Sequence, residues 1–353
     1  MKKRILTLIL AAMLTLSACG TTEQPEATTT TPAETTTAAE TTADDTTSPA
    51  ETTEAEEEKS FITNRVIEGD TTGLTPAVWQ VTDPESGNSL KMMGTIHLIP
   101  ETSSPVPQYV MDIYNESDGI AVEYDISRVQ LDMVVQIKYL SYFVLNDGTL
   151  ITDHLTPENY EGVKARLTEY GMYNEAFDAY SANYWESLLT SARVLNIEGM
   201  QDTGIDSYFI GIAKEDGKEV RDIEELETQM NALTASTDEM LNYSISEMLS
   251  ITDEEFEEDF MELYNMWATG DVDGYVEMDN EGMDEYPEEL LEDYEHYNDL
   301  MMVQRNIGMA EKAAEYIENG DNIFYMVGFA HFCGDGSVID LLEEQGYTVE
   351  RIH

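Results

Sequence analysis

The feature that most restricts the fold of this chain is the alternation of short apolar runs with long stretches of helical periodicity. The short runs, each bounded by turn residues, are Val78–Thr82, 89–93, 119–125, 219–224, 323–327 and 347–352. Apolar residues recur at helical spacing in 107–115, 129–212 and 301–318. Strands that alternate with helices are typical of sheets covered by helices. We therefore predict a mixed α/β (α+β) fold with a central β-sheet and a large helical insertion.

Polar residues stand at the ends of three of these predicted strands. Gly94-Thr95-Ile96-His97 and Gly328-Phe329-Ala330-His331 repeat one Gly-x-x-His pattern, and Glu123 ends a third apolar run. Glycine at the first position would permit a sharp exit from the strand, and polar groups gather at the ends of strands in α/β sheets. Two imidazoles and a carboxylate suit a divalent metal ion. The alternative is that both histidines are structural.

The charge of the chain excludes one class of partner. Of 353 residues, 17 are Lys or Arg and 72 are Asp or Glu, which gives a formal net charge of −55. Nucleic acid is not an expected partner, because its phosphates are bound by clusters of Lys and Arg. Between Arg221 and Arg305 there is no Lys or Arg, while large apolar residues recur at helical spacing. We predict that this acidity lies on solvated helix faces.

The N-terminus has the pattern of an export signal. Lys2-Lys3-Arg4 precedes an apolar run, 5–16, that is too short to span a bilayer comfortably. Leu16-Ser17-Ala18-Cys19 then matches a bacterial lipobox, whose cysteine is acylated after cleavage. An ordinary secretory signal with a chance cysteine is the alternative. We predict a signal peptide (1–18), a Thr- and Glu-rich disordered tether (19–60) and a folded domain (61–353) held outside the cytoplasm by a lipid on Cys19.

Several motifs together resemble the TraB/GumN family, which includes the Tiki membrane-anchored proteases and the pheromone-shutdown proteins of conjugative plasmids. The resemblance rests on both Gly-x-x-His segments and on these further segments: Val122-Glu123-Tyr124-Asp125, Thr203-Gly204-Ile205-Asp206, Ile223-Glu224 with Gln229, Gln304-Arg305-Asn306, Gly334-Asp335-Gly336 and 341–349. It implies a fold related to the erythromycin-esterase superfamily and, for Tiki-like members, a metal-dependent peptidase.

The resemblance also implies roles for the polar residues at the strand ends. His97, His331 and one carboxylate, Glu123 or Glu224, would hold a divalent metal ion such as Mn, Co or Zn. The other carboxylate would accept a proton from the attacking water. The expected substrate is a peptide or protein.

The pair Arg305-Asn306 completes the predicted site. Arg305 would stabilise an oxyanion or bind a substrate carboxylate through its planar donors, and Asn306 would assist it. A different class of function stays open: a non-catalytic surface lipoprotein that binds or sequesters a peptide in the same pocket.

Overall fold

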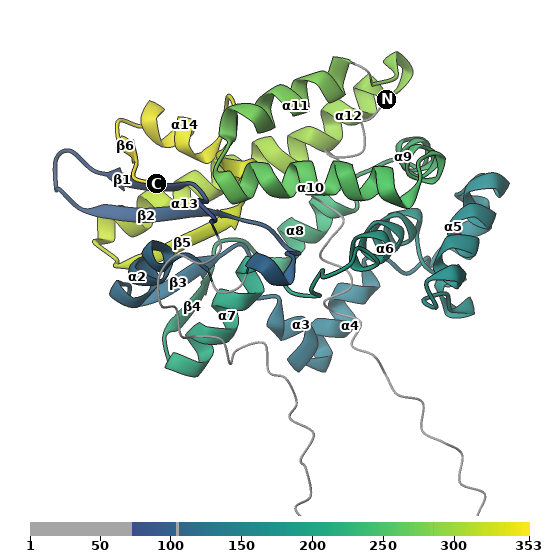
Figure 1. Ribbon diagram of the computed structural model, residues 1–353, viewed down its shortest axis with the longest axis horizontal. Helices are drawn as coiled ribbons and strands as arrows, with labels where there is room; N and C mark the ends of the chain where they lie inside the picture. Colours follow the sequence, from purple (N-terminus) through teal and green to yellow (C-terminus); the bar gives the residue numbers. More distant parts are fainter. Residues whose placement is uncertain (1–72, 104–105, 285) are drawn as a thin grey trace, which may run out of the picture.

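A six-stranded sheet organises the computed structural model, which describes residues 73–103, 106–284 and 286–353 (Figure 1). Its strands are β1 Val78–Thr82, β2 Ser89–Thr95, β3 Gly119–Val122, β4 Glu219–Asp222, β5 Ile323–Gly328 and β6 Thr348–Arg351. They lie in the order β4-β3-β5-β2-β1-β6. The first four of these run parallel, and β1 is antiparallel to both β2 and β6. The predicted mixed α/β fold with a central sheet is confirmed.

Strand β2 is longer than its sequence pattern indicated. The predicted hairpin forms with Val78 opposite Met93 and Thr82 opposite Ser89. Beyond Met93 the strand continues to Thr95, so that Gly94 pairs with Val327 of β5. The glycine of the first Gly-x-x-His segment therefore lies inside the sheet.

Some helices cover both faces of this sheet, and others extend away from it (Figure 1). The helices are α2 Gln108–Glu116, α3 Ser127–Leu131, α4 Met133–Ser141, α5 Pro157–Glu169, α6 Ala182–Leu195, α7 Ile205–Asp216, α8 Leu226–Leu233, α9 Asp238–Ser250, α10 Asp253–Thr269, α11 Val272–Asp284, α12 Leu291–Asn298, α13 Gln304–Asn319 and α14 Val338–Glu344. Successive side chains of a strand point to opposite faces. Phe324 of β5 packs against Phe209 of α7, and the hydroxyl of Tyr325 donates to the carbonyl of Met309 in α13 at 2.9 Å. Helices α7 and α13 thus lie on opposite faces.

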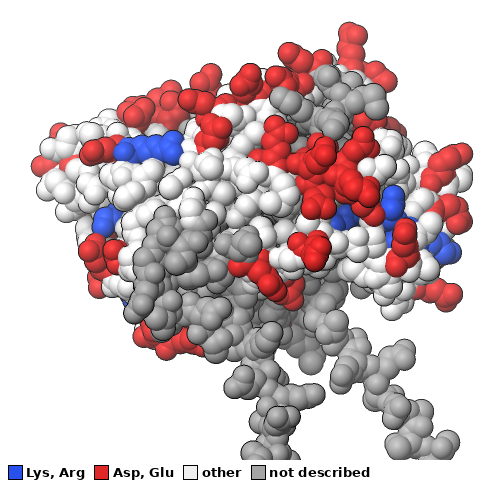
Figure 2. Space-filling view, in the orientation of Figure 1, with Lys and Arg blue, Asp and Glu red and all other residues white. Residues whose placement is uncertain are grey.

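The predicted helical insertion extends away from the sheet as α5, α6, α9 and α10 (Figure 1). Helix α10 buries its apolar stripe, which includes Phe256 and Phe260, and it exposes acidic residues such as Glu257. Figure 2 shows Asp and Glu gathered on this side of the molecule, so the predicted solvated acidic face is confirmed. Trp267 of the same helix donates from Nε1 to the carbonyl of Gly94 at 2.9 Å. The insertion is therefore tied to the first Gly-x-x-His segment.

Some predictions from the sequence lie outside the described residues. They are the signal peptide (1–18), the tether (19–60), the acylated Cys19 and the first part of the predicted domain, up to residue 72. In the part of the chain that the structure does describe, we find no helix that is both long and apolar enough to cross a membrane. The buried core of that part runs from Leu74 to Leu342.

A buried carboxyl in α6 makes stability depend on pH. The Ser244 hydroxyl donates to Oε1 of Glu186 at 3.2 Å, and burial raises the pKa of Glu186 to about 7 in spite of that hydrogen bond. The folded chain binds this proton more tightly than the unfolded chain does. The protonated Glu186 therefore contributes its full stability below pH 4.5, which is the ordinary pKa of the group. That contribution is lost as the pH rises through about 7.

We expect Glu186→Gln to raise the free energy of unfolding at pH 8 by about 1–3 kcal/mol and to change it little at pH 4.5. Urea denaturation at the two pH values measures the difference. The matched control is Glu198→Gln, at an exposed position, which should have the same small effect at both. An effect of Glu186→Gln that does not depend on pH would contradict the argument.

Candidate functional site

Four polar side chains lie just beyond the carboxyl ends of four neighbouring parallel strands. Across the sheet they are Glu224 after β4, Glu123 after β3, His331 after β5 and His97 after β2. Parallel strands end at one edge of a sheet, so residues distant in sequence meet there. The structure therefore brings together both histidines and both acids that the sequence singled out.

The carboxylate of Glu123 lies at the centre of this group. Its Oε1 accepts a hydrogen bond from the backbone N–H of Gly328 at 2.7 Å, and its Oε2 accepts from Arg305 Nη2 at 2.7 Å and from Gln229 Nε2 at 2.9 Å. Burial alone would raise the pKa of Glu123, but the charge of Arg305, then His331 and His97, and the Gly328 N–H lower it to about 2. Glu123 is therefore a fixed negative charge.

Asn306 orients His331. The Asn306 amide nitrogen donates to the carbonyl of Gly336 at 2.9 Å, which leaves its Oδ1 to accept from Nδ1 of His331 at 2.6 Å. With the proton on Nδ1, the lone pair of the neutral ring is on Nε2, 3.9 Å from Glu123 Oε1. Burial and then the charge of Arg305 lower the pKa of His331 to about 3, against the opposing charge of Glu123. His331 is thus held neutral, with Nε2 toward the carboxylate.

His97 has a different orienting partner, the carboxylate of Asp206. Nδ1 of His97 lies 3.1 Å from Asp206 Oδ2, at the start of α7. Burial by itself would lower the pKa of His97, but the charge and hydrogen bond of Asp206, together with the charge of Glu123, raise it to about 9. Gly204 brings this helix close, because a Cβ at Gly204 would lie 2.3 Å from the carbonyl carbon and oxygen of His97.

Arg305 joins the two acids. Its Nη2 donates to Glu123, and its Nε lies 3.0 Å from both carboxylate oxygens of Glu224. Burial raises the pKa of Glu224 to about 7, with Glu123 adding to the rise and Arg305 opposing it. Arg305 lines the cavity described below, whereas Glu224 is absent from its described lining. Arg305 thus contacts two protein carboxylates and, through Nη1, the carbonyl of Met301 at 3.3 Å, and Asn306 contacts His331.

The two glycines of the Gly-x-x-His segments allow close packing. Neither has a positive φ, so the expected sharp exit from the strand is not what requires glycine. A Cβ at Gly94 would lie 2.8 Å from the Phe329 side chain and 2.9 Å from its Cα, and a Cβ at Gly328 would lie 3.1 Å from Glu123 Oε1. Glycine at both positions lets backbone and carboxylate approach closely.

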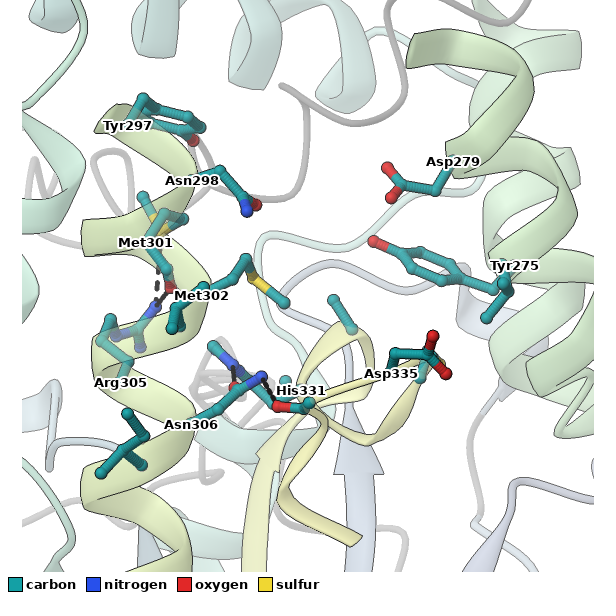
Figure 3. A pocket seen from close by; sticks show the side chains of 18 of the residues that line it. Tyr275, Asp279, Tyr297, Asn298, Met301, Met302, Arg305, Asn306, His331 and Asp335 are labelled. Atoms are coloured by element: carbon teal, nitrogen blue, oxygen red, sulfur yellow. Dashed lines mark hydrogen bonds between the residues drawn. The ribbon is translucent and has the colours of Figure 1, made fainter. Parts of the chain in front are cut away.

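The side chains of His97, Glu123, Arg305, Asn306 and His331 lie at one end of a cavity of about 470 Å³ (Figure 3). Tyr275 and Asp279 of α11 form the wall opposite α12 and α13, and Met302 projects between the two walls. A π-helical segment, Asp299–Val303, connects α12 to α13 just before Arg305. The cavity therefore combines a charged end with aromatic and thioether side chains.

Two residues of this network were part of the sequence motifs but had no role assigned from the sequence. They are Asp206, which holds His97, and Gln229, which donates to Glu123. Because Gln229 donates through Nε2, its Oε1 is an acceptor, and this buried atom has no hydrogen-bond partner among the described residues. Their position within the motifs was the only sign in the sequence that Asp206 and Gln229 belong to the site. The fold is needed to show that Asp206 contacts His97 and that Gln229 contacts Glu123.

Comparison with known proteins identifies the family of the chain. The model of the TraB/PrgY/gumN family matches residues 77–351. The chain belongs to this family. The match begins one residue before β1 and ends with β6, so the TraB/PrgY/gumN unit contains the whole sheet together with its helical insertions. Searches of the curated proteins and of the solved structures gave no match.

The close approach of Gly204 to His97 can be tested by substitution. We expect Gly204→Ala to lower the free energy of unfolding by about 1–3 kcal/mol, because the new Cβ meets backbone atoms that cannot rotate away. Gly308 of α13, which has no atom within 4 Å of an added Cβ, is the matched control. Gly308→Ala should raise stability by about 0.5–1 kcal/mol through helix propensity. Equal effects of the two substitutions in urea denaturation would contradict the role of Gly204.

Proposed function

We propose that this TraB/PrgY/gumN-family chain is a metal-dependent hydrolase that acts on peptides outside the cytoplasm, anchored by a lipid on Cys19. One observation carries the catalytic part: two imidazoles, each held through Nδ1 by another side chain, lie beside a buried carboxylate at the end of a cavity. The lipobox at residues 16–19 supports the location.

The donor chemistry of His97, His331 and Glu123 fits a divalent metal ion. Histidine ligands ordinarily have their second nitrogen fixed by a carboxylate or carbonyl oxygen, as Asp206 and Asn306 do here. Within the described residues, no three His, Cys, Asp or Glu side chains already form an enclosing cluster. Binding would therefore displace the proton that His97 holds and would shift these side chains toward one another.

A bound divalent ion would polarise a peptide carbonyl and lower the pKa of a water molecule. Arg305 places a permanent positive charge at the same end of the cavity, where it stabilises negative charge that develops on a carbonyl oxygen. Gln229, which lines the cavity, holds Glu123 through Nε2, and its buried Oε1 has no partner among the described residues.

The two carboxylates have different positions, and we assign them different roles. Glu123 lines the cavity, so it acts directly, as a ligand or as the acceptor of the proton from water. Glu224, absent from the described lining, acts as a positioning residue that holds the guanidinium of Arg305.

The second candidate is a peptide-binding lipoprotein without turnover. The observation that favours it is that both oxygens of Glu123 already accept hydrogen bonds from the chain, from Arg305, Gln229 and Gly328. A site closed in this way could hold a peptide in the aromatic part of the cavity without catalysis. Metal content together with turnover of a peptide library separates the two functions.

The ligand assignment predicts the effect of removing each histidine. We expect His97→Ala and His331→Ala each to lower metal occupancy while the chain stays folded, because strand-end residues contribute less to the core than apolar ones do. Elemental analysis of the full chain after incubation with Mn, Co or Zn is the measurement. His154→Ala is the matched control, since Nδ1 of His154 lies 2.8 Å from Asp238, outside the site. Equal occupancy in wild type and all three variants would exclude these ligands.

The roles of the carboxylates predict unequal effects of two isosteric changes. Glu123→Gln should reduce kcat roughly 10²–10⁴-fold, the usual cost of losing a general base, because an amide can neither accept the proton nor bind a metal as a carboxylate does. Glu224→Gln should cost much less, because Gln can still accept a hydrogen bond from Arg305. The kcat on a cleaved peptide is measured beside metal content, which shows whether Glu123 is the ligand or the base. Full activity of Glu123→Gln would disprove the assignment.

A further inference from the structure

A helical tip formed by α3 and α4 exposes large apolar side chains to solvent. Leu131 is 80% exposed, Met133 74%, Val134 76% and Ile137 61%. These are four of the eight large hydrophobic residues that are exposed in the described chain, and they fall within seven consecutive positions. Figure 1 shows α3 and α4 at the edge of the molecule, away from the acidic helix α10. Contiguous exposed apolar surface of this kind marks an interaction site.

The charge of this tip differs from that of the rest of the chain. Residues 127–145 contain Arg128 and Lys138 against one acid, Asp132, which gives +1 in a chain whose net charge is −55. The side chains of Arg128 and Lys138 are 41% and 52% exposed and lie on either side of the apolar residues. Both are ion-paired within the chain, Arg128 with Asp125 and Asp222, and Lys138 with Glu227 at 3.8 Å. The tip is thus an apolar edge with an ion-paired basic side chain on each flank.

The local structure holds this edge in place without the help of the exposed side chains. The carboxylate of Asp132 accepts from the backbone N–H groups of Val134 and Val135 and so caps the start of α4. On the inner side, Val129 and Tyr139 are almost fully buried in the core. The exposed residues therefore contribute little to folding, and their apolar character calls for another explanation.

We propose that the tip formed by α3 and α4 inserts into the surface of a phospholipid bilayer. Apolar side chains at the level of the acyl chains, with Arg and Lys at the level of the phosphates, are the arrangement that an interfacial segment requires. A second copy of the chain fits less well, because two bodies of net charge −55 repel one another. This role is independent of hydrolysis in the cavity.

Tryptophan fluorescence of the full chain tests this contact directly. The native residues Trp79, Trp185 and Trp267 are buried, at most 6% exposed, so a new indole at the tip can be distinguished from them. The full chain carrying Val134→Trp is reconstituted at low density into phosphatidylcholine vesicles, with or without bromine on the acyl chains. We expect the added emission to shift to shorter wavelength and to lose intensity in the brominated lipid. Glu85→Trp, in the exposed β1–β2 turn, is the matched control and should show neither change.

A second pair of variants separates membrane insertion from other causes that would shield the indole at position 134 from water. Adding Met133→Asp and Ile137→Asp to Val134→Trp should abolish the quenching, whereas adding Met133→Leu and Ile137→Leu should preserve it, with unchanged circular dichroism in both. Emission from Val134→Trp that stays at the wavelength of exposed indole would overturn the proposal. A blue shift without quenching by brominated lipid would also overturn it, because it would identify a protein partner or a second copy at the tip.

Discussion

The site depends on one buried cation between two buried carboxylates. Arg305 is 6% exposed and donates to both Glu123 and Glu224. Removing one member of such a group leaves an unpaired buried charge, which is far more costly than losing an exposed ion pair. Because the acids follow β3 and β4 while Arg305 belongs to α13, the same contacts also fix this helix over the strand ends. The planar guanidinium suits this bridging role in a way that an ammonium group does not.

Much of the sheet could be predicted from the sequence, because its signals are local. The hairpin of β1 and β2 has apolar strands on either side of a turn, and β5 is an apolar run that ends in glycine. The set of strand-end residues followed from the same signals, since a parallel sheet brings the ends of its strands to one edge. The mixed α/β fold and the family were predicted correctly for these reasons.

The contacts within the site could not be predicted, because they depend on tertiary placement. Asp206 reaches His97 across 109 positions of sequence, and Arg305 reaches Glu123 across 182. The sequence placed Arg305 and Asn306 in the site but did not show their contacts with Glu123, Glu224 and His331. The reason for the two strand-end glycines was assigned incorrectly, because close packing, unlike a turn, leaves no trace in local sequence.

The π-helical segment before Arg305 limits how the length of this chain can vary. Such a segment corresponds to one residue added to an α-helix, and an α-helix turns by about 100° per residue. Deleting one residue from Asp299–Val303 would restore regular winding and rotate the α12 wall of the cavity relative to Arg305 and Asn306. Tyr297 would no longer face the cavity that His331 lines. The binding surface should therefore tolerate exchange of side chains here far better than a change in chain length.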